Sequence, residues 1–110
     1  MKFRVGDLVT YSQWKQWEGF ETRWGDQPEW SNRNRGVVVG YAKIVDDGGE
    51  PSRWVPLEND VEQGTFDELR RLSGAAYKVQ WVDENCPWAI HSSNNNYYES
   101  ELDLLCRGMR

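Results

Sequence analysis

Apolar and polar residues alternate most regularly between residues 75 and 83. The apolar positions of this block are Tyr77, Val79 and Trp81, and the polar positions between them are Lys78 and Gln80. A period of two predicts a strand with one buried face. Residues 36–45 contain three consecutive valines, whose branched side chains favour a second, buried strand over a helix.

Three weaker blocks extend this pattern. Residues 2–11 predict a strand with a bend at Gly6-Asp7, because glycine tolerates the backbone angles of a bulge. Residues 88–92 predict a further strand. The block 97–105 starts as a strand, turns tightly near Ser100-Glu101-Leu102 and ends as a strand. Together the five blocks predict a mainly β chain of five strands.

Two long insertions separate the blocks, at residues 12–35 and 46–74. The second insertion returns as a short strand at 53–55 and then predicts a short helix at 66–72.

The predicted helix has signals at both ends. Thr65 and Glu68 have the spacing of a capping box, in which each side chain serves the other residue's backbone N–H. Arg70 and Arg71 suit the last turn, because the helix dipole favours cations there.

Four segments, in this order along the chain, resemble a known fold: Val-Gly-Asp-Leu-Val, Gly-Val-Val-Val, Tyr-Lys-Val-Gln-Trp and Tyr-Glu-Ser-Glu-Leu-Asp-Leu-Leu. They look like an SH3-like barrel of the Tudor and KOW type, and more narrowly like small SH3-like proteins of tailed bacteriophages. The matching stretches are residues 2–11, 36–45, 75–83 and 88–105. The resemblance implies one five-stranded SH3-like barrel domain over residues 1–110, which binds rather than catalyses. The two insertions depart from the compact pattern.

Charge is unevenly distributed along the chain. The net charge is −5, and residues 46–68 alone carry −7, with Arg53 as the one base among eight acids. Clustered bases are what phosphate binding needs, so nucleic acid is not an expected partner. The acids either form a solvated loop or an acidic face for a basic partner. The candidate acidic face comprises Asp46, Asp47, Glu50, Glu58, Asp60 and Glu62.

The first insertion carries four of the seven tryptophans. Tryptophan is enriched at the energetic centres of protein interfaces. The tryptophan rings of this insertion either fold back over the core, contact a partner protein, or line a groove for a small ligand or peptide. The run Asn32-Arg33-Asn34-Arg35 is either a surface turn or a contact for a carboxylate or phosphate. The candidate interface residues are Trp14, Trp17, Phe20, Trp24, Trp30, Arg33 and Arg35.

An aromatic cage of the Tudor type would need rings at loop tips beside an acid. Tyr11, Trp81 and Trp88 offer rings, with Asp83 or Glu84 as the acid, although core aromatics explain the same positions.

Catalysis has little support in the sequence. His91 is the only histidine, and no Ser or Cys motif surrounds it, so a place on a strand surface is expected. Cys86 and Cys106 lie twenty positions apart without a CxxC motif, which predicts two reduced thiols rather than a zinc site. No cofactor or metal is expected. No apolar run approaches the roughly 20 residues of a spanning helix, and secretion is not expected because Met1 to Arg4 lead directly into a strand pattern.

These observations lead to three functional hypotheses. The first is a non-enzymatic structural or interaction protein, an accessory virion component such as a capsid decoration, tail or connector subunit, present in several copies. The second is a phage-encoded regulator that binds a host protein through the acidic face. The third is a KOW-like nucleic-acid-binding module, which the net charge opposes. The expected location is the virion or the host cytoplasm.

Overall fold

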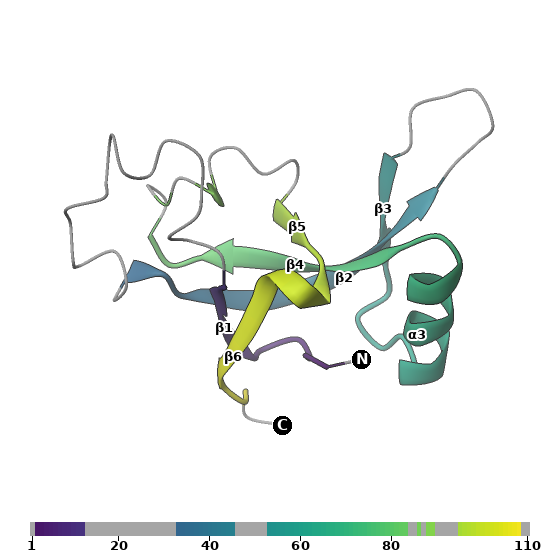
Figure 1. Cartoon of the computed structure of the whole chain (residues 1–110). Coiled ribbons are helices and arrows are strands. Elements are labelled where there is room, and N and C mark those ends of the chain that lie inside the picture. Colours follow the sequence, from purple (N-terminus) through teal and green to yellow (C-terminus); the bar gives the residue numbers. More distant parts are fainter. Residues whose placement is uncertain are drawn as a thin grey trace.

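The computed structural model describes residues 2–12, 33–45, 53–83, 86, 88–89 and 95–108. In this part of the chain, one antiparallel sheet of six strands is accompanied by one α-helix (Figure 1). The elements in chain order are β1 (Leu8–Tyr11), β2 (Gly36–Val45), β3 (Arg53–Leu57), α3 (Gln63–Leu72), β4 (Ala75–Trp81), β5 (Asn96–Tyr97), a 3-10 turn (Glu99–Glu101) and β6 (Leu102–Cys106).

The long strand β2 is the centre of the sheet. The strand order is β5-β4-β2-β1-β6, and β3 pairs with the C-terminal part of β2. One edge of β2 therefore pairs with β4, while its other edge pairs with β1 near its start and with β3 near its end. In Figure 1, β2 and β4 run side by side across the molecule, and α3 lies at the end where the chain leaves β3.

The prediction of a mainly β chain is confirmed, with two differences in its strands. The segment 53–57 is a full strand, so the described sheet has six strands rather than five. Within the described residues, β5 and β6 lie at the two ends of the strand order and do not pair, so closure into an SH3-like barrel stays a prediction.

Strand β4 follows the predicted alternation. Tyr77, Val79 and Trp81 are buried, whereas Lys78 and Gln80 are exposed. On the same buried face, Val38 pairs with Val79 and Tyr41 pairs with Tyr77. The register shifts between Val38 and Gly40, and this irregularity explains why Val38 and Tyr41, three positions apart, both face the core.

The helix begins earlier than the sequence predicted. It starts at Gln63, and its N-cap Glu62 makes no side-chain capping bond, so the capping box of Thr65 and Glu68 is wrong. The backbone N–H of Phe66 instead donates to the carbonyl of Glu62, at 3.0 Å. Phe66 is fully buried against the rings of Tyr41 and Tyr77, and this contact places Thr65 inside the first turn.

The end of the helix agrees with the prediction. Arg70 and Arg71 occupy the last turn, and the N–H groups of Ser73 and Gly74 both donate to the Leu69 carbonyl. Gly74 has φ of +131°, where other residues are strained, and a Cβ atom there would come within 2.9 Å of Ile44.

Two further strand predictions are corrected in part. Trp88 and Ala89 form a helical turn rather than a strand, with the Ala89 N–H donating to the Cys86 carbonyl at 3.0 Å. The turn allows the Trp88 ring to enter the core; residues 90–92 lie outside the described part. The first strand is limited to Leu8–Tyr11, because Gly6, with φ of +98°, and Asp7 form the expected bend before it.

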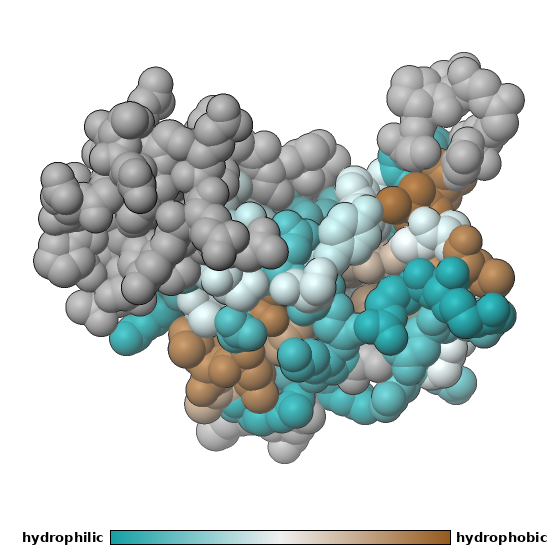
Figure 2. All heavy atoms as spheres, viewed as in Figure 1, coloured by the Kyte–Doolittle hydropathy of each residue, from teal (hydrophilic) through white to brown (hydrophobic). Residues whose placement is uncertain are grey.

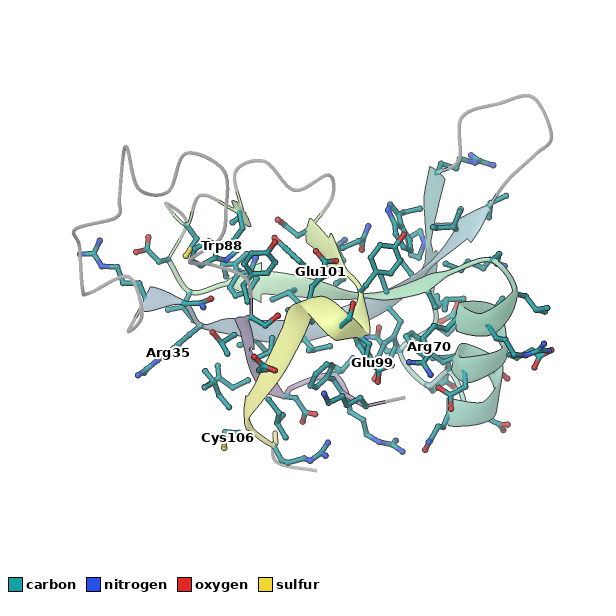
Figure 3. All side chains as sticks on the ribbon, in the orientation of Figure 1. Arg35, Arg70, Trp88, Glu99, Glu101 and Cys106 are labelled. Atoms are coloured by element: carbon teal, nitrogen blue, oxygen red, sulfur yellow. The ribbon has the colours of Figure 1, made fainter. Side chains whose placement is uncertain are left out.

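A buried hydroxyl joins the N-terminal segment to the rest of the fold. The Tyr77 hydroxyl accepts the N–H groups of Lys2 at 2.9 Å and Phe3 at 3.3 Å, and it donates to Glu99 at 3.2 Å. The other carboxylate oxygen of Glu99 pairs with Arg70 of α3, and Figure 3 shows these two side chains pointing toward one another. Burial, reinforced by the Glu99 carboxylate, raises the pKa of the Tyr77 hydroxyl.

Cys86 and Cys106 are free thiols, the first buried and the second exposed. Burial is the main cause that raises the pKa of the Cys86 thiol from 9.0 to about 12, and the Asp83 carboxylate adds to it. Between pH 9.0 and about 12, the folded protein therefore keeps the proton of the Cys86 thiol, whereas the unfolded chain releases it. It follows that the contribution of Cys86 to stability is complete below pH 9.0 and is lost as the pH rises toward 12.

We expect the free energy of unfolding to fall between pH 9.0 and about 12, and to fall less steeply in the Cys86→Ala variant. One such group contributes at most about 1.4 kcal/mol for each pH unit. Urea unfolding of both proteins along a pH series measures the two slopes. Tyr77 is present in both proteins, so it cancels from the comparison. Parallel slopes would show that the folded Cys86 thiol ionises as readily as an unfolded one.

Candidate functional site

A cleft of about 450 Å³ opens on the face of the sheet that carries Lys78 and Gln80, which we call the outer face. Strand register explains its composition. Ala42 stands opposite both Pro56 and Ala76, and Lys78 stands opposite Asn96, so side chains of β3, β2, β4 and β5 share this face. The lining residues are Tyr41, Ala42, Trp54, Pro56, Lys78, Asn95 and Asn96.

One wall of the cleft is apolar and aromatic. Trp54 is half-buried, and its ring lies 5.6 Å from the ring of Tyr98, which is 45% exposed. Pro56 follows on the same strand, which pairs only with β2, and proline is tolerated on such an edge strand. Partly exposed tryptophan and tyrosine rings bury large areas on binding with little loss of rotamer entropy.

The opposite wall carries polar groups that lack partners. The Oδ1 atoms of Asn95 and Asn96 are both buried, and neither accepts a hydrogen bond from a residue that the structure describes. A buried acceptor without a donor costs about 1–3 kcal/mol, so each such group in a folded protein calls for an explanation. Asn95 also has φ of +55°, which asparagine tolerates better than most residues.

Lys78 supplies the positive charge of the cleft. It is exposed, and it forms no ion pair with any residue of the described ranges. The cleft therefore combines two hydrogen-bond acceptors, one cation and an aromatic wall. Such a combination can recognise a ligand that has N–H donors, an apolar group and a negative charge.

Most residues of the predicted interface and acidic face lie outside the described part of the chain. For these residues the two interpretations stay predictions. They are Trp14, Trp17, Phe20, Trp24, Trp30, Asp46, Asp47 and Glu50.

The run at 33–35 divides into three different environments. The Nε atom of Arg33 lies 3.6 Å from Asp83. Asn34 is buried, and its side-chain amide exchanges two hydrogen bonds of 2.9 Å with the backbone of Tyr11. Arg35 is exposed at the start of β2 and extends away from the sheet (Figure 3). Asn34 is thus part of the core rather than of a surface turn.

The three described acids of the predicted acidic face are all exposed. Glu58 and Asp60 lie in the connection from β3 to α3, and Glu62 caps the helix. None of them lines the cleft. Their exposure is compatible with either a solvated loop or a charged contact surface.

The aromatic positions considered for a Tudor-type cage do come together, but in the core. The rings of Tyr11 and Trp88 stack at 5.5 Å, and those of Trp81 and Trp88 meet edge to face at 5.8 Å. Trp81 and Trp88 are only 6% and 2% exposed, and the Trp81 indole N–H donates to the Tyr97 hydroxyl. These rings are therefore core residues. Glu84 and His91 lie outside the described residues.

Sequence reasoning did not anticipate the cleft. Trp54 was expected in a short strand at 53–55, and neither Pro56 nor the two asparagines was a candidate binding residue. No local pattern links these residues, because cross-strand register is needed to bring the two groups to one site.

Other kinds of site find no support in the described ranges. No group of three or more His, Cys, Asp or Glu side chains is placed there to hold a metal ion. The helix in those ranges is too short and too polar to cross a membrane. Comparison of the chain with protein-family models, curated proteins and solved structures yields no match.

Proposed function

We propose that this chain is a non-enzymatic protein-interaction module that holds a short peptide segment of a partner protein in the cleft. The observation that carries the proposal is a cleft that holds the Trp54 ring, Lys78 and two asparagines whose buried Oδ1 atoms accept no hydrogen bond from a described residue. A peptide has the groups that these atoms lack, because its backbone presents N–H donors at regular spacing.

The other residues of the cleft indicate which side chains the bound peptide carries. An apolar side chain packs against Trp54 and Pro56, and a carboxylate, either an Asp or Glu side chain or a free C-terminus, pairs with Lys78. A nucleic acid would also offer donors and negative charge. However, the net charge of −5 and the presence of one cation, Lys78, among the described lining residues oppose a polyanion.

Panning a library of random seven-residue peptides on the purified protein tests this proposal. The enriched peptides should carry an apolar residue with a carboxylate nearby. Trp54→Ala and Lys78→Glu should each weaken binding of a selected peptide about tenfold or more. Gln80→Glu is the control, because it places the same glutamate side chain on the same face of β4 outside the cleft, and it should change affinity less than threefold.

The outcomes are distinct. Enrichment of the same peptides on a Trp54→Ala, Lys78→Glu double variant would show that they bind elsewhere and would overturn the proposal. Binding of single-stranded oligonucleotides in a gel shift at about 50 mM salt, without peptide enrichment, would favour the KOW-like alternative.

The biological setting that we propose is a phage particle, where an SH3-like module would serve as a capsid decoration, tail or connector subunit. It rests on the order of the strand segments in the sequence and is compatible with an antiparallel sheet. Mass spectrometry of purified particles tests it, since absence of the chain from them contradicts a virion role. The exposed Glu58, Asp60 and Glu62 support the alternative, a regulator whose binding to a host protein weakens steeply with salt.

A further inference from the structure

A second area of the outer face is apolar and lies apart from the cleft. It comprises Leu8, Val37, Val39, Val82 and Leu105, which we call the apolar patch. Leu105 is 49% exposed, Val82 68% and Val39 36%. Figure 2 shows an apolar area over the lower ends of β1 and β6, bordered by hydrophilic side chains. Exposed apolar groups that adjoin one another on a sheet face mark interaction surfaces.

Strand register shows that the patch runs across neighbouring strands. Leu8 of β1 pairs with Val37 of β2, and Val37 pairs with Gln80 of β4. On the other side of β1, Leu8 pairs with Cys106 and Val9 with Leu104, so Leu105 is the extra residue beside Leu8. The patch therefore has β6 on one flank of β1 and β2 on the other.

The two flanks have complementary shapes. Leu105 stands on the β6 flank and is half-exposed. The β2 flank contains a shallow hollow of about 390 Å³, which is lined by Val37, Val39, Gln80, Trp81 and Val82. A protruding leucine and an apolar hollow thus lie on opposite sides of β1 at the level of Leu8.

The two flanks of β1 also carry opposite charges at the level of Thr10, two residues after Leu8. Asp103 of β6 pairs with Thr10. Arg35 stands on the other side of Thr10, because the next residue, Gly36, pairs with Val9. Both side chains belong to exposed residues, and neither forms an ion pair with a described residue.

We propose that a second copy of this chain packs on the apolar patch, about a two-fold axis that runs parallel to β1 and passes over Leu8. This rotation turns the two sheets face to face and exchanges their flanks. Leu105 of each copy then enters the hollow beside Val37 of the other. The same rotation sets Asp103 against the partner subunit's Arg35, twice in the dimer.

The charges are the reason to choose a second copy over another occupant. A purely apolar partner, or a lipid surface, would cover the patch but leave Arg35 and Asp103 without counter-charges at its border. One symmetry operation matches both the leucine with the hollow and the acid with the base. A surface that complements itself in this way is what an isologous interface requires.

Sedimentation velocity over a range of concentrations tests the proposal. The wild-type chain should dimerise reversibly. Arg35→Asp and Asp103→Arg should each weaken the dimer about tenfold or more, because each places like charges together at two symmetric positions. The double variant restores both pairs with reversed polarity, and its dissociation constant should return to within about threefold of the wild-type value. An equimolar mixture of the two single variants should form heterodimers, in which every pair is opposite in sign.

Leu105→Asp should abolish the dimer, and Leu72→Asp is its control because Leu72 is an exposed leucine on α3, 65% exposed. Circular dichroism checks that each variant folds. If Leu105→Asp does not fold, the charge variants still test the proposal. A chain that is monomeric at every concentration up to about 1 mM would overturn the proposal. Charge reversals that weaken the dimer without restoration in the double variant would also overturn it. Either failure would leave the peptide-binding proposal intact, because the cleft shares no residue with the patch.

Discussion

Replacing Phe66 by alanine should lower the free energy of unfolding by about 4 kcal/mol, as is typical when a buried phenylalanine is truncated in a well-packed core. Phe66 is fully buried and is the one buried residue of α3. Its ring lies 5.1 Å from that of Tyr77 and 5.7 Å from that of Tyr41. The truncation therefore opens a cavity where the helix meets the sheet.

Urea unfolding followed by far-UV circular dichroism measures this effect. The control is Leu72→Ala on the same helix, where the side chain is 65% exposed and the change should be within about 0.5 kcal/mol. A loss below about 1 kcal/mol for Phe66→Ala would mean that other contacts, such as the Arg70–Glu99 ion pair, hold the helix in place. Hydrogen exchange of the amides in α3 would then separate local from global unfolding.

The second large effect concerns Asp7, a fully buried carboxylate. Its Oδ2 accepts the N–H of Arg4 at 2.9 Å, and its Oδ1 accepts the N–H of Gly108 at 2.8 Å. The Arg107 guanidinium also lies 3.4 Å from Oδ2. Asp7→Asn replaces one acceptor by a donor of almost the same size, and leaves a backbone N–H facing another N–H. We expect a loss of about 3 kcal/mol in the free energy of unfolding.

The effect should be concentrated where the two ends of the described chain meet. Gly108 lies so close to Gly6 that a Cβ atom on it would fall 2.5 Å from the Gly6 carbonyl oxygen. Losing the carboxylate should therefore raise amide exchange at Gly108 first. Asp60→Asn, at an exposed carboxylate in the connection from β3 to α3, is the control and should cost less than about 0.5 kcal/mol. An equal cost for the two variants would contradict the role assigned to Asp7.

Those elements that have strong local patterns were predictable. The alternation in β4 depends only on the period of two, and the valine run of β2 depends on the stiffness of branched side chains, so both strands were recognised. The arginines at the end of α3 were recognised for a similarly local reason, namely their position relative to the helix dipole.

The start of α3, the turn at Trp88 and the burial of Asn34 were not predictable in this way. Each is decided by a contact that is distant in sequence: Phe66 with Tyr77, Trp88 with Tyr11, and the Asn34 amide with the Tyr11 backbone. The cleft belongs to the same class. Trp54 and Asn96 are far apart in the chain, and the pairing of β3 with β2, of β2 with β4 and of β4 with β5 brings them to one face.

The sequence by itself determined that the chain is mainly β, which side of β4 is buried, and where the negative charge is concentrated. These properties follow from neighbours within a few residues. The tertiary structure alone decided which strands pair and in what register. It thereby brought the two asparagines into one cleft with Trp54, and it set Asp103 across β1 from Arg35. Register depends on the sum of many weak contacts between distant segments, and no local pattern encodes that sum.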